Sequence, residues 1–334
     1  MLCTMALPRE FRRWRVALVG FGDVARRLLT QRMAANGGTR HGPKFIAAGR
    51  SRPEYLTRSH VPAGSATSRH QWLSCNLDDH RAVQRLVRIS QAAVLLAPPA
   101  DLPGPSATKD MRMRRWASCV RATGRSIPGV YISTTGVYGD HQGDVVTETT
   151  VCRPGQARSM RRLDAETSLR SLGIHILRTP GIYAADRLPV VRLKAAQPAL
   201  QREDDVWTNH IHADDLARMA WIGLWRGKPG RVTNAVDESE LRMGDYFDKV
   251  ADALHLPRPP RVSRQEMQVQ AASGRISPMA MSFLSESRRI RSNRLTMELR
   301  VRLRYPTVDD GLRDACQAAC VGAVSPTSSA AQRP

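Results

Sequence analysis

The stretch RWRVALVGFGDVARRLLTQRM, residues 13–33, decides the fold class. Its first part, Val16–Val19, is a nearly continuous apolar run, which is typical of a strand buried on both faces of a parallel sheet. From Asp23 onward the apolar residues recur at helical spacing. The stretch therefore predicts a strand, a tight turn at GFGDVA and a helix, which together open a β–α–β unit.

The same alternation continues along the chain to about residue 180. Apolar runs in KFIAAGR, AAVLLAPPA, GVYISTTGVYG and IHILRTPGIY predict further strands, and segments with helical spacing separate them. This alternation predicts an α/β fold, a doubly wound parallel sheet with helices on both faces. Downstream the pattern becomes irregular, with proline-rich joints at 256–260 and 277–278, so we expect a smaller, more helical C-terminal subdomain.

The charge balance points to an anionic partner. The chain has 51 lysine and arginine residues against 30 aspartate and glutamate residues, a formal net charge of +21. Such an excess suits nucleic acid, a membrane surface or an anionic small molecule. The basic residues are spread along the chain with few aromatic residues between them, which disfavours nucleic acid because bases stack on aromatic side chains. We expect an anionic small-molecule substrate and leave the oligomeric state open.

Other features of the composition concern location. The sequence has no apolar run of about 18 residues, so we expect no membrane span. Its first 15 residues lack the apolar core of a secretory signal. The six cysteines are scattered and form no Cys-x-x-Cys pair, which favours reduced thiols over disulfides or a metal site. We therefore expect a cytoplasmic protein.

The turn GFGDVA has the spacing GxGxxA between a predicted strand and a predicted helix. In a dinucleotide-binding turn the first glycine permits the tight turn, the second lets the backbone approach a pyrophosphate, and the alanine allows close packing of helix on strand. The helix N-terminus then faces the phosphates. An ordinary strand–helix turn without a ligand is the alternative. We favour the dinucleotide site, with these candidate binding residues: Gly20, Phe21, Gly22, Asp23, Val24 and Ala25.

The end of the second strand bears on the choice of cofactor. NAD-specific sites usually place a carboxylate there to hold the ribose 2′-hydroxyl. In this chain Arg50, Ser51 and Arg52 follow the strand, and no carboxylate appears before Glu54. A guanidinium group suits a 2′-phosphate, so the sequence predicts NADP, with NAD as the less favoured cofactor. Arg50 and Arg52 are the candidate residues; simple solvation of these side chains is the alternative.

Four motifs carry a family resemblance. They are STTGVYGD at 133–140, ILRTPGIY at 176–183, NHIHADDLA at 209–217 and SNRLTMELRVRLRYPTVDDGLRDA at 292–315. With the glycine turn, they resemble the short-chain dehydrogenase/reductase superfamily, and within it the extended NAD-dependent epimerase/dehydratase group and its atypical offshoots. The resemblance covers about residues 14–313.

The resemblance implies a Rossmann-type domain with an interleaved C-terminal substrate subdomain. In that group the last core strand returns to the sheet after the first substrate segment, and RVTNAVDE fits this strand. We therefore expect an N-terminal tail over 1–13, the Rossmann domain over 14–183, the subdomain over 184–317 interrupted by a core strand at about 231–237, and a disordered tail over 318–334.

The resemblance also implies a catalytic pattern that this chain keeps only in part. In such enzymes a Ser or Thr hydroxyl orients the substrate oxygen, a Tyr is the general acid/base, and a Lys four residues later lowers its pKa and holds the nicotinamide ribose. The hydroxyl position falls on Thr134. Counting back from Glu166 puts Arg162 in the Lys place and Arg158 in the Tyr place. No Tyr-x-x-x-Lys occurs anywhere in the chain.

This departure leaves the proton-transfer group in doubt. Arginine does not deprotonate in proteins, so Arg158 cannot act as a general base. Arg162 can supply the charge of the Lys and its contact with the cofactor ribose. Tyr138 is a candidate acid because it lies near a strand end, as does Tyr183; ring packing in the core is the alternative for each. The candidate catalytic residues are thus Thr134 and Tyr138.

Two further features have open alternatives. His210, His212, Asp214 and Asp215 could be read as a metal cluster, but we expect no metal and instead predict that Asp214 caps a helix that Asp215 also favours. Arg178 could lie near the cofactor or form a structural pair.

The sequence supports two hypotheses about function. The first is an NADP-dependent oxidoreductase or epimerase/dehydratase-like enzyme, with a sugar nucleotide or a phosphorylated carbonyl compound as substrate. The second is an NADP(H)-binding sensor or structural module with little or no turnover, which the missing Tyr-x-x-x-Lys favours.

Overall fold

The computed structural model describes residues 14–35, 42–53, 70–101 and 103–323. Seven parallel strands form its central sheet in the order β12-β7-β5-β4-β1-β2-β3. Their bounds are β1 Arg15–Val19, β2 Lys44–Gly49, β3 His70–Ser74, β4 Ala92–Leu95, β5 Gly129–Thr134, β7 His175–Thr179 and β12 Val232–Asn234. The inner strands are buried along nearly their whole length, as expected of a sheet covered on both faces.

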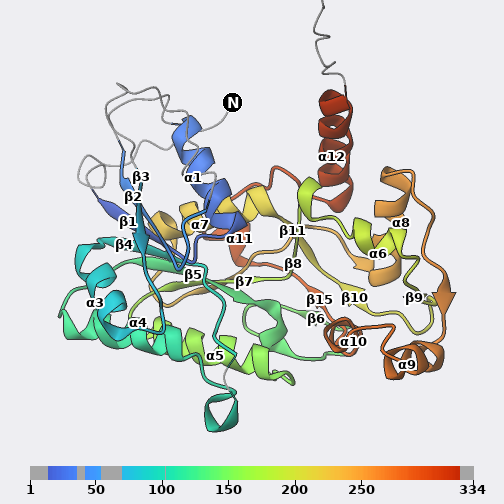
Figure 1. Cartoon of the computed structure of the whole chain (residues 1–334), viewed down its shortest axis with the longest axis horizontal. Coiled ribbons are helices and arrows are strands. Elements are labelled where there is room, and N and C mark those ends of the chain that lie inside the picture. The colour runs from blue at the N-terminus through green and yellow to red at the C-terminus, as the bar shows by residue number, and fades with distance from the viewer. Residues whose placement is uncertain (1–13, 36–41, 54–69, 102, 324–334) are drawn as a thin grey trace, which may run out of the picture.

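Helices cover the two faces of the sheet in separate layers (Figure 1). One layer holds α1 (Asp23–Ala35), α7 (Ala213–Arg226) and the short α11 (Arg294–Met297), and it shares one hydrophobic core with the sheet. The other layer holds α3 (His80–Ile89), α4 (Met111–Ala122) and α5 (Ala157–Arg170), with a second core. The predicted α/β fold with a doubly wound parallel sheet is confirmed.

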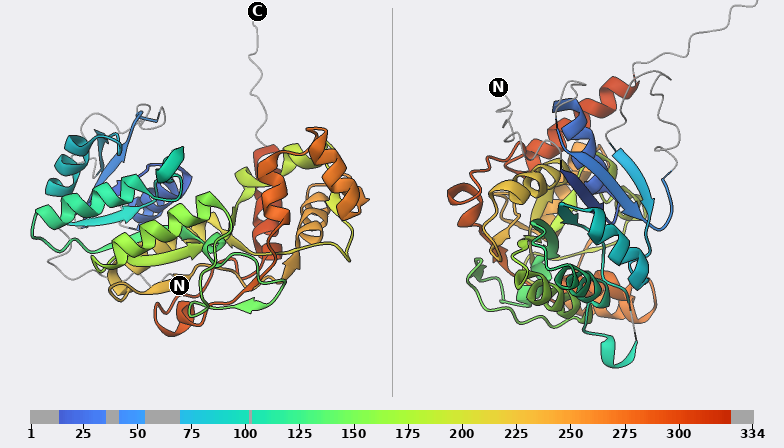
Figure 2. Two further views of the ribbon diagram at one scale, coloured as in Figure 1. Left: turned by 90° about the horizontal axis from the view of Figure 1, so that it is seen from below. Right: turned by 90° about the vertical axis from the view of Figure 1, so that its left-hand side faces the viewer.

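The rest of the chain forms a smaller subdomain beside the carboxyl ends of the strands, as the left view of Figure 2 shows. Tyr183, Leu193 and Val250 belong to its main core. Its helices are α6 (Val190–Lys194), α8 (Met243–Ala253), α9 (Arg264–Ala272), α10 (Pro278–Leu284) and α12 (Val308–Ala323). Four pairs of short strands complete it: β8 (Gly181–Tyr183) with β11 (His210–His212), β9 (Ala199–Leu200) with β14 (Arg261–Val262), β10 (Trp207–Thr208) with β13 (Leu241–Arg242), and β6 (Val145–Val146) with β15 (Arg289–Ile290).

The chain leaves the sheet after β7, builds part of the subdomain, and returns as β12 at the edge beside β7. β12 lies within the 231–237 segment where a late core strand was expected. The expected tails over 1–13 and beyond Ala323 lie outside the described residues. For 318–323 the expectation of a disordered tail is wrong: α12 continues to Ala323, and the alanines in this stretch have the highest intrinsic helix propensity.

The start of α7 also differs from expectation. The helix begins at Ala213, and its N-cap is His212, whose Nδ1 accepts a hydrogen bond from the Asp214 backbone N–H at 3.2 Å. Asp214 therefore lies inside the first turn and is not the cap. Asp215 accepts backbone hydrogen bonds from Arg304 and Tyr305, so it ties α7 to the segment before α12.

Within the part of the chain that the structure describes, no helix is long and apolar enough to cross a bilayer. Four cysteines in this part, Cys75, Cys119, Cys152 and Cys316, are free thiols.

Candidate functional site

The glycine turn joins β1 to α1 with the geometry that its sequence predicted. Gly20 has a positive φ of 86°, and a Cβ there would lie 2.5 Å from the backbone of Ala97, just after β4. Only glycine fits this approach. At Gly22 an added Cβ would meet nothing within 4 Å, so the backbone faces open space. Ala25 is fully buried against the sheet.

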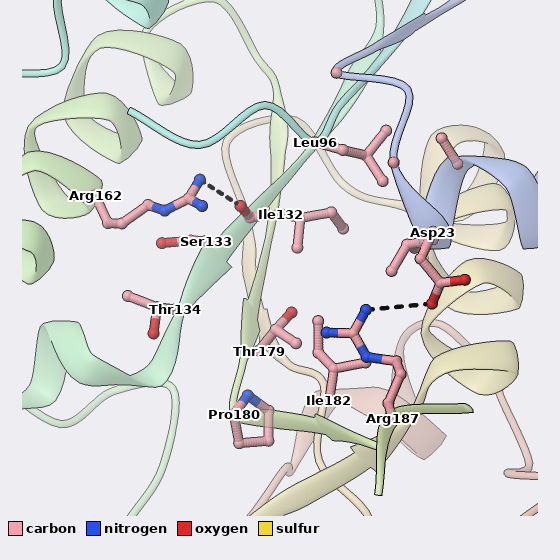
Figure 3. A pocket seen from close by; sticks show the side chains of 14 residues that line it. Asp23, Leu96, Ile132, Ser133, Thr134, Arg162, Thr179, Pro180, Ile182 and Arg187 are labelled. Atoms are coloured by element: carbon pink, nitrogen blue, oxygen red, sulfur yellow. Dashed lines mark hydrogen bonds and ion pairs between the residues drawn. The ribbon is translucent and has the colours of Figure 1, made fainter. Parts of the chain in front are cut away.

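A pocket of about 280 Å³ opens above this turn. It lies at the carboxyl ends of the central strands, where ligands bind in open α/β sheets. Figure 3 shows Arg162 and Arg187 on opposite sides of the pocket, with Thr134 on the side of Arg162 and Thr179 between the two arginines. Its lining includes most of the residues predicted from the turn: Gly20, Gly22, Asp23, Val24 and Ala25.

A charge network surrounds the N-terminus of α1. The Asp23 carboxylate binds Arg26 at 2.6 Å, Arg27 at 3.0 Å and Arg187 at 3.3 Å. Burial alone would raise the pKa of Asp23, but its bonds to Arg27 and Arg26 hold this pKa below its ordinary value. Asp23 is therefore ionised and shared among three guanidinium groups. Because these guanidinium groups offset the charge of Asp23, the N-terminus of α1 stays favourable for a phosphate.

A second cavity, of about 610 Å³, lies between the sheet domain and the subdomain. The two cavities adjoin, because four residues line both of them: Thr134, Arg162, Pro180 and Ile182. Two kinds of side chain dominate the second cavity. The aromatic ones are Tyr183, Trp207, Tyr246 and Phe283, and the charged ones are Arg158, Arg161, Arg162, Arg288 and Glu286.

Thr134 stands at the junction, at the end of β5. Its Oγ1 accepts a hydrogen bond from the Gly136 backbone N–H at 3.1 Å. An oxygen that already accepts can still donate its proton to a ligand. Thr134 therefore lines both cavities, and its role as a substrate-orienting hydroxyl stays a prediction.

Tyr138 lies elsewhere. It is fully buried, its hydroxyl donates to Asn234 Oδ1 at 2.7 Å, and the Arg178 guanidinium lies 4.8 Å from its ring centre. Burial raises the pKa of Tyr138, partly offset by Arg178. Tyr138 lines neither cavity, so the structure does not bring it together with Thr134. Its hydroxyl is committed to the core, and the acid role predicted for it has no support here.

Arg158 and Arg162 project from α5 beside Thr134. Arg162 Nη1 donates to the Tyr131 hydroxyl at 2.9 Å and to the carbonyl oxygens of Ile132 at 3.1 Å and Ala97 at 3.4 Å. The Arg158 guanidinium lies 4.6 Å from the ring centre of Phe283 in α10. Arg162 lines both cavities and Arg158 lines the second, so these two positions carry arginines in place of a titratable Tyr and Lys.

A buried ion pair connects α5 to the central sheet near Thr134. Glu166 on α5 binds Arg178 on β7 at 2.7 Å and accepts a hydrogen bond from Ser133 Oγ at 2.6 Å. The Glu166 and Arg178 side chains are 1% and 5% exposed. Of the two roles considered for Arg178, the structure therefore shows the structural pair.

Arg50 and Arg52 are exposed beyond the carboxyl end of β2, at the same edge of the sheet as the glycine turn. Neither lines the two cavities. Phe21, the remaining predicted residue, packs edge-on against Trp72 at 6.2 Å between ring centres. Residues 44–53 carry no carboxylate, as the sequence indicated.

The subdomain wall contains a buried imidazole. His210 is 4% exposed, its ring stacks on Tyr246 with centres 4.1 Å apart, and burial lowers its pKa to about 3. The Tyr183 hydroxyl donates to the Thr307 carbonyl at 3.0 Å. Burial raises the pKa of both tyrosines. None of the three is a ready proton acceptor or donor at neutral pH.

Sequence reasoning missed several residues that line the site. Arg187, from the short 3₁₀ helix η4 (Ala185–Arg187), carries no motif that marks it. Trp207 lines the second cavity, and no motif marks it either. Two of the quoted motifs gave a local signal for this wall: ILRTPGIY contains β8, and NHIHADDLA contains Asn209 and His210.

No protein-family model matches the sequence, and no curated protein does. The fold is like that of solved sugar-nucleotide epimerases and dehydratases, which agrees with the resemblance of the motifs. A dTDP-glucose 4,6-dehydratase from Bacillus anthracis, solved with NAD, is 15% identical with a TM-score of 0.69, covering 91% of this chain and 96% of that one. A UDP-glucose 4-epimerase from Thermotoga maritima, solved with UDP-glucose, is 12% identical with a TM-score of 0.67, covering 92% and 99%.

A conserved protein of unknown function from Silicibacter pomeroyi is more similar in sequence. It is 26% identical, with a TM-score of 0.66, and the match covers 92% of this chain and 99% of that one.

Proposed function

We propose that the chain binds a nicotinamide dinucleotide and uses it in an oxidoreductase or epimerase/dehydratase-like reaction on an anionic carbonyl or hydroxyl compound. The observation that carries the proposal is the pair of adjoining cavities. One begins at the glycine turn, the other is lined by arginines and aromatic rings, and Thr134 stands between them. Sugar nucleotides and phosphorylated carbonyl compounds are the substrate classes that the excess of positive charge suits.

The residues of the first pocket fit a dinucleotide. The open space at Gly22 is the space that a Cβ would begin to fill, and the N-terminus of α1 faces it. Arg187 lines the same pocket and can add a charge-assisted hydrogen bond to a phosphate. Arg162 lines the same pocket and can donate a hydrogen bond to a ribose hydroxyl. When bound, a nicotinamide supplies or accepts a hydride.

The form of the cofactor is a finer proposal. Arg50 and Arg52, with no carboxylate in residues 44–53, support NADP. Similar structures were solved with NAD, which supports the other form. We propose that the chain binds NADP, because of Arg50 and Arg52. The experiment therefore compares both cofactors.

The chain's own residues supply orientation and charge. Thr134 can donate a hydrogen bond to a substrate oxygen, and Arg158 and Arg162 can stabilise negative charge that develops beside it. The proton would come from a group other than these two arginines. A second candidate is a dinucleotide-binding sensor with little turnover. It is favoured because the chain has the glycine turn of a dinucleotide site but arginines at the two positions where the resemblance implies the acid/base Tyr and Lys.

The test is calorimetric titration with NADPH and NADH. We expect Gly22→Asp to abolish binding, because a carboxylate would enter the phosphate site. Gly155→Asp is the matched control, since that glycine also has open space around it but lies outside the pocket. Arg50→Ala should lower NADPH affinity toward that of NADH. A wild-type chain that binds neither dinucleotide would refute the proposal.

Turnover separates the two candidates. Net oxidation of NADPH, or conversion of a sugar nucleotide or phosphorylated carbonyl compound without it, supports the enzyme. Tight binding with no turnover over that panel supports the sensor.

A further inference from the structure

We propose that Arg158, with Thr134 and Arg162 beside it, forms a subsite for an oxyanion next to the reacting carbon of the substrate. The inference rests on the proposed function and narrows its substrate class. The substrate would carry a carboxylate or phosphate close to its carbonyl or hydroxyl group, as a 2-oxo acid or a small phosphorylated ketone does.

The first support is position. Arg158 and Arg162 are four residues apart on α5, which puts them on the same face of the helix, with Cβ atoms about 5–6 Å apart. Both line the cavity of about 610 Å³ together with Thr134. The helix lies tight against the turn after β5: a Cβ on Gly136 would lie only 2.6 Å from Ser159 Oγ. Gly136 is also the residue whose N–H binds Thr134.

The second support is the absence of a carboxylate partner. Arg161 pairs with Asp101 at 3.0 Å, and Arg288 pairs with Glu286 at 2.8 Å, although both arginines line the same cavity. Within residues 14–35, 42–53, 70–101 and 103–323, neither Arg158 nor Arg162 forms an ion pair. Their charge is therefore not balanced by a direct contact, although both side chains are partly withdrawn from water.

The remaining donors of these arginines are available. The three hydrogen bonds of Arg162 all use Nη1 and all go to neutral oxygens. The contact of Arg158 with Phe283 is a cation–π contact, which leaves its N–H groups without an acceptor in that contact. A guanidinium in this condition is suited to bind a carboxylate or phosphate through two parallel hydrogen bonds.

Asp110 is the carboxyl group that interacts electrostatically with Arg162. It is fully buried, and one of its oxygens caps α4 through the N–H groups of Arg112 and Met113. Burial raises the pKa of Asp110, partly offset by its hydrogen bonds to the backbone of α4 and by the charge of Arg162. Asp110 thus serves as the cap of α4 and does not line the cavity.

This arrangement discriminates between substrate shapes. A nucleoside diphosphate sugar presents neutral hydroxyl groups beside its reacting carbon, and its phosphates lie at the other end of the molecule. Such a substrate would leave both guanidinium groups without an anion. A compound whose acid group is only one or two bonds from the carbonyl places the oxygen at Thr134 and the anion at Arg158 simultaneously.

The experiment is calorimetric titration with oxalate and, separately, with methyl phosphate, on the free protein and on protein saturated with NADPH. UDP-glucose is the comparison ligand. The variants are Arg158→Gln, which removes the charge, and Arg158→Lys, which keeps it without the two-point geometry. Arg170→Gln is the matched control, since Arg170 lies on the same helix, is exposed and does not line the cavity.

We expect the wild-type protein to bind oxalate or methyl phosphate, and Arg158→Gln to lose about tenfold to a hundredfold in affinity, as for a charge-assisted hydrogen bond. Arg158→Lys should lose less, and Arg170→Gln nothing. Binding of oxalate alone identifies a carboxylate, and binding of methyl phosphate alone a phosphate. Unchanged NADPH affinity in Arg158→Gln shows that the variant is folded.

Two results would overturn the inference: no binding of either anion by the wild-type protein, or the same anion affinity in Arg158→Gln. Tight binding of UDP-glucose that Arg158→Gln does not weaken would do so as well. Failure of the wild type to bind NADPH refutes the proposed function instead, and the titrations of the free protein then still decide the subsite.

Discussion

The buried imidazole of His210 makes a quantitative prediction about stability and pH. The ring is stacked on Tyr246, and burial lowers its pKa to about 3, against about 6.5 for the same group in an unfolded chain. Below about pH 6.5 the unfolded state therefore gains a proton that the folded state does not accept. By linkage, the free energy of unfolding falls as pH falls.

The magnitude follows from the two pKa values. Each pH unit between them costs about 1.4 kcal/mol. Between about pH 7.5 and about pH 4.5, His210 should reduce the free energy of unfolding by about 2.7 kcal/mol. In His210→Phe this contribution is gone, while the aromatic ring still stacks on Tyr246.

The assay is urea unfolding of both proteins at several pH values, followed by tryptophan fluorescence. The difference in unfolding free energy between wild type and His210→Phe cancels the carboxylates that titrate in both proteins. Between about pH 7.5 and about pH 4.5, we expect the wild type to lose about 2.7 kcal/mol more unfolding free energy than His210→Phe does. His255→Gln, at an exposed residue, is the control for loss of an imidazole. Parallel pH profiles of wild type and His210→Phe would refute the reasoning.

Three further substitutions probe the surroundings of the site, each measured by urea unfolding. Glu166→Leu should cost about 3–5 kcal/mol because it leaves Arg178 buried without a counter-charge, and a cost below about 1 kcal/mol would mean that water reaches Arg178. Gly20→Ala should cost more than about 1 kcal/mol, since its φ of 86° disfavours a Cβ, and an unchanged unfolding midpoint would contradict the observed turn. Tyr138→Phe should cost about 1–3 kcal/mol by leaving Asn234 without its donor, yet NADPH affinity should stay; lost affinity would restore a site role for Tyr138.

The sequence could predict the elements whose causes are local. Val16–Val19, Gly20 and the start of α1 depend on residues within about ten positions, so apolar spacing and a single glycine sufficed. Thr134 came instead from the family resemblance of the motif STTGVYGD, and its catalytic role stays a prediction.

The sequence could not predict contacts between distant parts of the chain. Tyr138 is turned into the core by the 3₁₀ turn η3 (Thr135–Tyr138), and its acceptor Asn234 lies 96 residues away. Arg187 reaches Asp23 across 164 residues, from a short element without a recognisable pattern. The cap of α7 was misplaced because His212 took the role that the more usual aspartate was expected to have.

The place of β12 at the sheet edge bears on how the chain is synthesised. A ribosome delivers β7 before the intervening part of the subdomain, and about 55 residues separate the ends of β7 and β12. At about 5–20 residues per second, the backbone groups on that edge of β7 wait about 3–11 s for their partner strand. An unpaired strand edge invites association with other chains. A nascent chain of this protein should thus depend on chaperone cover in that interval, and a fragment ending at residue 183 would keep the exposed edge permanently.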